Sequence, residues 1–354
     1  MDIDTLSQFS AAQNLEGQTL ASGWVVGPRN ERQPGATGGV FSVSYPVTRN
    51  GERGFMKVID LVSGLGNIDR MQNLINEYVA ERDLLLMCAE QRLSRIVVAV
   101  DHGQFELPEY PIGGVYYIIF EMAESDVRIA LSREETVNLV FKLEVLHSLT
   151  AGLRQLHGQG VAHQDVKPSN LLVFSDASLP RRYGKVGDLG RAYRTGHPSM
   201  HDEFVAPGDR SYAPPEQLYG HVHPDIAMRR YASDLYQLGN VGSFIFAGAT
   251  INSLLSEELA PEHHWAQYGD DYTSVLPYVR NAYGRVIERL RAVPEEVMPA
   301  GVVALIHSLC DPEAERRGHP RSKGKMSSGN ALSRILTDLD LMAKRAIVSA
   351  ANTR

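Results

Sequence analysis

The chain has 354 residues, enough for two domains, and its 43% hydrophobic and 22% charged residues are ordinary for a globular protein. The net charge of -7 gives no general reason to expect nucleic acid or phospholipid as a partner. No apolar run reaches the roughly 18 residues of a membrane span, and residues 1–20 lack the basic start and apolar core of a signal peptide. These features favour a cytoplasmic location, and we expect Cys88 and Cys310 to be buried free thiols.

Residues 1–22 are polar with scattered Leu and Phe, and the sequence leaves open whether they form a short arm or a docking helix. From residue 23 to about 60 the pattern is typical of an antiparallel meander. Apolar runs at 41–47 and 54–59 flank an Asn-Gly pair, which strongly favours a tight turn. A glycine-rich connection precedes them, and the backbone amides of such a loop can approach phosphates because no Cβ intervenes.

Lys57 is the only lysine among the first 141 residues, and it lies in an apolar strand pattern where an ammonium group is costly unless it meets an anion. Residues 69–90 follow with helical periodicity. Glu77 and Glu81 lie four residues apart on one face of this helix, so the pattern allows either carboxylate to pair with the lysine.

An apolar β run at 115–123 is followed by a long amphipathic helix at about 136–158. The stretch 163–170 then places a carboxylate, an ammonium group and a carboxamide on one short loop, at Asp165, Lys167 and Asn170. Phosphoryl transfer uses such a set, because it needs a group that orients a hydroxyl, a cation near the transferred group and oxygen ligands for Mg²⁺.

The segments over about residues 23–320, taken in their order, resemble the eukaryotic-like, bacterial-type Ser/Thr protein kinase family. The loop 163–170 is similar to H-R-D-x-K-x-x-N, with Gln164 at the arginine position, as in the non-RD subtype. Residues 185–190, which contain Asp188, resemble the D-F-G segment with Leu for Phe.

Three later segments extend the resemblance. Residues 208–216 are similar to G-T-x-x-Y-x-x-P-E, with Asp209 in place of Thr. Residues 232–239 resemble the start of the family's αF helix, whose Asp, here Asp234, supports the catalytic loop. The late segment 309–320 is similar to D-P-x-x-R, in which Arg317 would form a buried ion pair with Glu216.

The resemblance implies an α+β, bilobal protein-kinase fold with an antiparallel β-rich N-lobe and a mostly helical C-lobe. We expect an N-terminal arm at 1–22, the N-lobe and hinge at 23–123, the C-lobe at 124–325 and a C-terminal helical extension at 326–354. Helices at 253–298 and an amphipathic helix at 328–350 carry no motif that we can interpret.

The resemblance also implies ATP and Mg²⁺ as cofactors and gives each loop residue a role. Asp165 would orient the acceptor hydroxyl and take its proton, and Lys167 would stabilise charge on the γ-phosphoryl group. Asn170 and Asp188 would hold Mg²⁺. His163 would be structural.

Lys57, locked by a helix glutamate, would hold the α- and β-phosphates. We favour Glu81 as its partner, because Leu85 and the distance to the next strand fit the family's αC helix better. Phe120 would close the back of the nucleotide pocket. Further contacts with ATP are expected from the glycine-rich loop and the hinge, at Gly38, Gly39, Ser42, Glu121 and Ala123.

The sequence departs from the family at three places. The glycine-rich loop is degenerate, and in the register that we prefer Gly39 takes the second glycine position and Ser42 the third. Phe55 stands where the family has an Ala that packs against adenine. Gln164 removes the arginine that binds a phosphorylated activation segment in many kinases, so we expect activity that does not depend strongly on phosphorylation in 191–212.

The resemblance to protein kinases implies protein substrates and the possibility of autophosphorylation. The sequence does not show which protein is the substrate, what signal activates the chain or what its oligomeric state is. The degenerate loop and Phe55 keep a pseudokinase scaffold open as an alternative. A small-molecule kinase of aminoglycoside-phosphotransferase type shares the Asp, Asn and Asp set, but the segment 213–216 and Asp234 argue against it. A third alternative is a non-enzymatic adaptor that docks through 253–298 or the terminal helix.

Overall fold

A computed structural model describes residues 8–31, 42–133, 138–176, 179–268, 271–322 and 330–352. The chain divides into two compact units, Met1–Ala123 and Glu124–Arg354. The first unit is built on an antiparallel sheet and the second is mostly helical. The predicted α+β class, with a β-rich first part and a helical second part, is confirmed.

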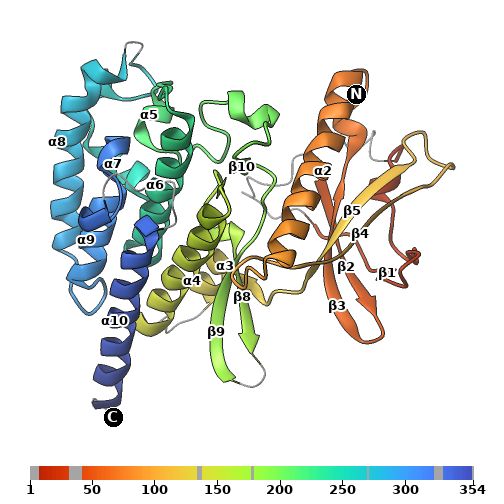
Figure 1. The fold of residues 1–354 in the computed structure, drawn as a ribbon, viewed down its shortest axis with the longest axis horizontal. Helices are drawn as coiled ribbons and strands as arrows, with labels where there is room; N and C mark the ends of the chain where they lie inside the picture. Colours follow the sequence, from red (N-terminus) through yellow and green to blue (C-terminus); the bar gives the residue numbers. More distant parts are fainter. Residues whose placement is uncertain are drawn as a thin grey trace. The chain divides into compact units, whose positions relative to one another are not determined.

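The first unit contains one five-stranded antiparallel sheet in the order β1-β2-β3-β5-β4 (Figure 1). Its elements, where η denotes a 3-10 helix, are η1 (Ala11–Gln13), β1 (Val25–Val26), β2 (Ser42–Arg49), β3 (Glu52–Ile59), η2 (Leu61–Gly64), α2 (Ile68–Glu90), β4 (Ala99–Glu106) and β5 (Gly114–Glu121). The hairpin of β2 and β3 turns at Asn50 and Gly51, whose φ angles of 49° and 84° both lie in the left-handed region. An Asn-Gly pair adopts these angles readily, so the predicted tight turn is confirmed.

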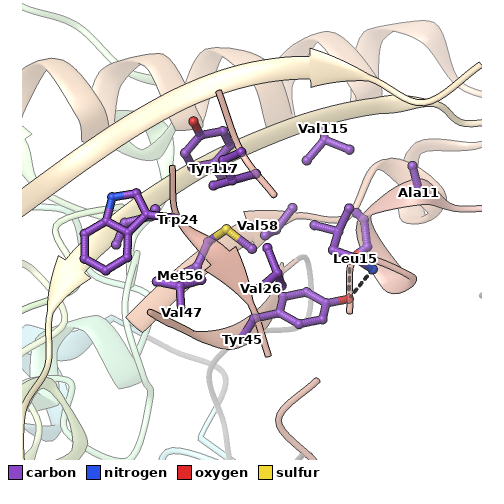
Figure 2. Packing of buried hydrophobic residues seen from close by; sticks show 13 residues of the cluster. Ala11, Leu15, Trp24, Val26, Tyr45, Val47, Met56, Val58, Val115 and Tyr117 are labelled. Carbon is purple, nitrogen blue, oxygen red and sulfur yellow. Dashed lines mark hydrogen bonds between the residues drawn. The ribbon is translucent and has the colours of Figure 1, made fainter. Parts of the chain in front are cut away.

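One face of this sheet packs against the N-terminal segment to form the hydrophobic core of the first unit (Figure 2). Ala11 and Leu15 are fully buried beside Tyr45. The Tyr45 hydroxyl donates to the Ala12 carbonyl at 2.8 Å, and burial raises the pKa of Tyr45 to about 12. Residues 8–22, whose form the sequence left open, therefore contribute to the core of the first unit.

Helix α2 begins after Asn67, whose side chain accepts a hydrogen bond from the Arg70 backbone N–H at 2.9 Å and so caps the first turn. The Tyr78 hydroxyl lies 3.1 Å and 3.2 Å from the carbonyl oxygens of Gly103 and Tyr117, which fastens the helix to the sheet. The buried face of α2 consists of Leu74, Tyr78, Glu81, Leu84, Leu85 and Cys88.

The second unit is mostly helical, with a three-stranded sheet in the order β6-β8-β9 and the short pair β10-β7. Its first half contains β6 (Ser125–Asp126), α3 (Val127–Arg133), α4 (Leu139–Gly158), β7 (Val161–Ala162), η3 (Pro168–Asn170), β8 (Leu171–Asp176), β9 (Leu179–Val186), β10 (Tyr193–Arg194) and η4 (Met200–Glu203). Its second half contains α5 (Pro215–Leu218), α6 (Ile226–Ala247), α7 (Ile251–Glu258), η5 (Pro261–His263), α8 (Tyr272–Arg291), α9 (Ala300–Leu309), η6 (Ala314–Arg316), η7 (Pro320–Ser322) and α10 (Asn330–Asn352).

Four helices share the core of the second unit, to which α4, α6, α9 and α10 contribute Leu146, Leu238, Ile306 and Ile335. Figure 1 shows α10 alongside α4. One face of the first half of α10 is buried, at Leu332, Ile335 and Leu339, whereas Ile347 and Val348 in its second half are 50% and 60% exposed. The terminal amphipathic helix expected from the sequence is therefore observed, with one half of it packed in the fold.

Both cysteines, Cys88 and Cys310, are buried free thiols as expected. Within the described ranges, no single helix is long and apolar enough to span a membrane. Helices α6 and α7 reach the required length and apolarity only as a pair, with a bend of 86° between them.

Candidate functional site

The loop 163–170 follows β7 and is bonded to helix α6. The Asp234 carboxylate on α6 accepts the backbone N–H groups of His163 at 2.7 Å and Gln164 at 2.8 Å, and it contacts His157 Nε2 at 2.8 Å. Asp234 is fully buried, and a buried carboxylate is tolerated only with partners of this kind. The expected support of the loop by Asp234 is therefore confirmed.

Gln237, one turn further along α6, extends this support. Its Oε1 accepts the Val166 backbone N–H at 2.9 Å, and its Nε2 donates to the Gln164 carbonyl at 3.0 Å. Our reading of the sequence missed this residue. The available signal was its spacing, because Arg230, Asp234 and Gln237 recur every three or four residues and so share one face of α6.

His163 connects the loop to the segment that follows β9. Its Nδ1 accepts the Asp165 backbone N–H at 3.2 Å, so the proton lies on Nε2, which donates to the Gly187 carbonyl at 3.0 Å. Both ring nitrogens are used within the fold, which supports the structural role expected for His163.

Asp165 and Lys167 are each only 6% exposed, and Lys167 Nζ lies 2.9 Å from Asp165 Oδ2. Asn170 Nδ2 donates to the Asp165 carbonyl at 2.9 Å and to Oδ2 at 3.2 Å. The Asp209 backbone N–H donates to Asp165 Oδ1 at 2.7 Å. Donors on both oxygens therefore fix the orientation of the Asp165 carboxylate, as a proton acceptor for a hydroxyl requires.

The Asp209 side chain adds a second carboxylate next to Lys167, with its Oδ2 3.8 Å from Lys167 Nζ. The ammonium group therefore lies between two carboxylates, Asp165 and Asp209. A Thr at this position, as in the family pattern, would carry no charge. Asp209 thus competes for Lys167 and leaves a net negative charge at this point of the loop.

Asp188 lies beside Asn170, because β8 and β9 pair with Leu171 opposite Val186. The Gly187 backbone N–H donates to the Asn170 carbonyl at 2.9 Å. Asp188 has a φ of 58°, a left-handed value that non-glycine residues seldom adopt and that often marks functional sites. The structure therefore brings the two expected Mg²⁺ ligands to the same end of one hairpin.

The chemistry of this pair fits Mg²⁺. The side-chain Nδ2 of Asn170 donates to Asp165, so the side-chain oxygen Oδ1 is the atom that can bind a cation. Asp188 supplies a carboxylate. Mg²⁺ is usually bound by one or two carboxylates together with phosphate oxygens and water. The described ranges contain no cluster of three His, Cys, Asp or Glu side chains suited to a metal, and an ion of this kind needs none.

In the first unit, strand β3 carries Lys57 and helix α2 carries Glu81. Lys57 Nζ donates to both carboxylate oxygens of Glu81, at 3.0 Å and 2.9 Å. The Glu81 side chain is 8% exposed and the Lys57 side chain 26% exposed, so the carboxylate is largely shielded from water and the ammonium group only partly. Of the two glutamates that the sequence offered, the structure pairs Glu81 with the lysine.

Comparison with known proteins identifies the fold. Residues 38–318 match the model of the protein kinase domain. The chain belongs to the protein kinase domain family.

Individual relatives cover shorter parts of this kinase domain. It is 29% identical over 210 residues to serine/threonine-protein kinase NLK2 of Xenopus laevis, which covers 58% of this chain and 41% of that protein. It is 32% identical over 119 residues to serine/threonine-protein kinases drp72 of Corynebacterium efficiens, which covers 33% of this chain and 21% of that protein. It is 32% identical over 102 residues to mitogen-activated protein kinase 5 of Arabidopsis thaliana, and this match covers 29% of this chain and 25% of that protein. The chain therefore spans less than half the length of these relatives.

Phe55 lies on the same face of the kinase domain's sheet as Lys57, since side chains two residues apart on a strand point to one side. Phe120 is directly opposite it on β5, and Pro46 is opposite it on β2. Phe55 is 37% exposed, whereas its neighbour Met56 is buried in the core. The phenyl ring therefore stays on the lysine side of the sheet.

The structure describes only three of the five other residues expected to contact ATP. Ser42 is the first residue of β2, whereas Gly38 and Gly39 lie outside the described residues. The Glu121 backbone N–H donates to the Val98 carbonyl at 3.1 Å, so this N–H is not available to a ligand. Ala123 is the last residue of the first unit.

Arg230 is a further residue that the sequence reading missed. It is fully buried on α6, and burial lowers its pKa to about 10, so it stays charged at neutral pH. Its Nη2 donates to the carbonyls of Asp202 at 2.7 Å and of His201 and Phe204 at 3.2 Å. Its Nη1 donates to Gln164 Oε1 at 3.3 Å. Arg230 thus ties the expected activation segment, 191–212, to the loop 163–170.

A close backbone contact reinforces this tie. A Cβ added at Gly208 would lie 2.3 Å from the Gln164 carbonyl oxygen and 2.8 Å from Asp165 Oδ1. Both distances are shorter than the contacts that a Cβ atom makes in proteins, so only glycine allows the segment to approach the loop this closely.

Proposed function

We propose that this kinase domain transfers the γ-phosphoryl group of ATP to Ser or Thr hydroxyls of protein substrates, and that it can also phosphorylate itself. The observation that carries the proposal is the Asp165 carboxylate, which is held by the Asp209 N–H and the Asn170 amide beside the Lys167 ammonium group. Lys167, two residues after the aspartate, is the arrangement of Ser/Thr kinases rather than tyrosine kinases. The relatives from Corynebacterium efficiens and Xenopus laevis are named serine/threonine-protein kinases, which supports the Ser/Thr class of kinase.

In this proposal each side chain has one task. Asp165 orients the acceptor hydroxyl and takes its proton, and Lys167 stabilises charge on the transferred group. Lys57, held by Glu81, binds the α- and β-phosphates of ATP. Asn170 and Asp188 hold Mg²⁺, which supplies neutralisation of the phosphate charge when it is bound.

The test is phosphate transfer by the purified chain. Wild type is incubated with ATP and Mg²⁺, and phosphorylation of its own Ser and Thr residues and of a generic protein substrate is measured. Transfer that the substitution Asp165→Asn abolishes supports the proposal, and a wild type that binds ATP without any transfer overturns it.

We also propose that activity does not depend on a phosphorylated activation segment. Gln164 replaces the arginine that would bind such a phosphate, and its carboxamide is engaged with α6, where its Nε2 donates to the Arg230 carbonyl at 2.8 Å. Arg230 in turn holds three carbonyls of the segment. A buried guanidinium group therefore orders the segment without an added charge.

Removal of phosphate should accordingly leave the kinase active. Treatment with a phosphatase, verified by mass spectrometry over 191–212, should change the rate of transfer to a protein substrate by no more than about twofold. The matched comparison is Arg230→Met, which should lower the rate in both samples because the carbonyls of the segment lose their donor. A rate that falls on dephosphorylation and returns on rephosphorylation would contradict the proposal.

A second candidate function, an ATP-binding or adaptor scaffold, is favoured by one observation, the position of Phe55. Its ring lies on the Lys57 face of the sheet at the place where the family has a small Ala. If the ring takes up space needed by adenine, nucleotide affinity falls while the catalytic loop stays intact.

The substitution Phe55→Ala measures how strongly the phenyl ring hinders ATP binding. We expect the substitution to lower the ATP KM by roughly three- to tenfold, since removal of a steric conflict of about 1 kcal/mol has that effect. The measurement is an ATP titration of phosphate transfer, with Val25→Ala, an exposed position on β1, as the control. An unchanged or higher KM would show that adenine does not meet the ring.

The bacterial-type assignment is supported by the match to the Corynebacterium efficiens protein, beside matches to eukaryotic kinases. The cytoplasmic location stays a prediction from the sequence.

A further inference from the structure

The N-terminal segment of the first unit is bonded to Asp60, at the junction between the strand that carries Lys57 and the helix that carries Glu81. Ser10 Oγ donates to Asp60 Oδ1 at 3.0 Å, and Gln13 Nε2 donates to Asp60 Oδ2. Ser10 is fully buried, so its contact with the carboxylate is shielded from water. Hydrogen bonds to a charged acceptor are the stronger kind.

Asp60 also begins the path to the helix. It is the N-cap of η2, and its Oδ1 accepts the Val62 backbone N–H at 3.2 Å. Asp60 lies three residues after Lys57 and eight residues before Ile68, the first residue of α2. The carboxylate that binds residues 10 and 13 therefore fixes the short connection between β3 and α2.

A second contact reaches the same helix through Ile112. The Ala11 N–H donates to the Ile112 carbonyl at 2.9 Å, and the Ile112 N–H donates to the Phe9 carbonyl at 3.0 Å. The Ile112 side chain packs in a separate buried cluster with Leu61 and Leu74, from η2 and α2. The segment is thus linked to α2 through a polar route and through an apolar route.

The face of α2 that receives this contact is the face that carries Glu81. Leu74 and Glu81 are seven residues apart, about two helical turns, so both lie on the buried side. A helix held at its start and at Leu74 keeps Glu81 at a fixed distance from β3. Release of the start would let the helix shift and would weaken the contact with Lys57.

We propose that residues 9–13 are a positioning element, which holds the junction at Asp60 and thereby keeps Lys57 paired with Glu81. The inference rests on the proposed function only in that this pair binds ATP phosphates. The positioning residues are Ser10 and Gln13, and their target is the Asp60 carboxylate.

A swap of charge between residues 13 and 60 tests the proposal. Gln13→Glu places a carboxylate against Asp60, whereas Asp60→Asn keeps an oxygen that can still cap η2 but turns its Nδ2 toward Gln13 Nε2, because Gln13 Oε1 already accepts from Arg29 Nη1. The double variant Gln13→Glu with Asp60→Asn restores a donor opposite an acceptor. Glu16→Gln, an exposed change of charge on the same segment, is the control.

The primary readout is hydrogen exchange of the α2 backbone amides, which can be measured whether or not the chain transfers phosphate. We expect roughly tenfold faster exchange over α2 in each single variant and recovery in the double variant, in line with the loss of one charge-assisted hydrogen bond. The ATP KM should rise in the single variants and recover in the double variant, with no change in Glu16→Gln.

Unchanged exchange over α2 in both single variants overturns the proposal, even if activity falls. Faster exchange that the double variant does not reverse also overturns it, because a pairwise contact predicts rescue. If wild type transfers no phosphate, the proposed function fails, whereas the exchange result still decides the inference.

Discussion

Asp165→Asn should lower the rate of phosphate transfer by about a hundredfold to ten-thousandfold, the range that a positioned proton acceptor contributes. An amide cannot take the proton of the acceptor hydroxyl. It also cannot accept hydrogen bonds on both sides, where Asp165 now meets the Asp209 N–H at 2.7 Å and Lys167 Nζ at 2.9 Å. The loss should therefore appear in kcat more than in the KM for ATP, because Lys57 and its partner lie on other elements.

The control for this variant is Asp83→Asn. Asp83 is an exposed carboxylate on α2 that pairs with its neighbour Arg82, so its loss changes the net charge equally and should alter the rate by no more than about twofold. Thermal unfolding of both variants checks that the fold is kept. Full activity of Asp165→Asn would show that another group accepts the proton, and Asp209, whose Oδ2 lies 3.8 Å from Lys167, is then the residue to test.

Much of the second unit's site could be predicted from the sequence because it depends on short spacings. Asp165, Lys167 and Asn170 lie within six residues, so a single loop brings them together wherever it lies. Asp188 came from the resemblance of 185–190 to the D-F-G segment, and the pairing of β8 with β9 brings it to the same end of the hairpin as Asn170. The supporting role of Asp234 was predicted only from the family resemblance. Asp234 lies 69 residues after Asp165, and local sequence patterns do not indicate contacts over such a separation.

The residues that the sequence reading missed act through contacts that are distant along the chain. Arg230 meets carbonyl groups at 201–204, and backbone carbonyls carry no sequence signal. Gly208 was matched to the glycine of the family pattern, but its close approach to Gln164, which requires a glycine, depends on the path of the whole segment. A buried arginine in an apolar helix indicates some partner, but only the fold shows which one.

The N-terminal segment shows a different limit. Residues 8–22 have too few apolar residues to predict a strand or a helix, and the sequence left their form open. Ala11 and Leu15 are nevertheless fully buried, because the sheet offers an apolar face that a short irregular segment can cover. Burial here is decided by the neighbouring strands and not by the periodicity of the segment itself.

The ion pair of Glu216 with Arg317 was predicted from two distant motifs and is confirmed in full. Arg317 Nη1 lies 2.7 Å from Glu216 Oε1, and Nη2 lies 2.5 Å from Oε2. Arg317 also donates to the Asp311 carbonyl at 2.8 Å and lies over the ring of Tyr236. Burial alone would lower the pKa of Arg317, but the Glu216 carboxylate raises it above its ordinary value, so the guanidinium group is charged at any working pH.

Glu216→Gln should therefore destabilise the kinase domain by about 3–5 kcal/mol, because it leaves a buried charge without its counter-ion. Denaturant unfolding measures the loss. Arg316→Met is the matched control, since the neighbouring Arg316 side chain is 56% exposed and its surface ion pairs should contribute no more than about 1 kcal/mol. Equal losses of unfolding free energy in the two variants would show that burial does not increase the contribution of the Glu216–Arg317 ion pair.

The double variant Glu216→Gln with Arg317→Met separates the value of the pair from the cost of breaking it. Removal of both charges leaves no uncompensated buried ion, so we expect it to be more stable than Glu216→Gln alone. Glu216 lies in α5, directly after the segment that contacts Asp165, and Arg317 also donates to the Ala232 carbonyl of α6 at 3.3 Å. If the pair also positions that segment, the double variant regains stability without regaining full activity, and a recovery of both would assign the pair to stability alone.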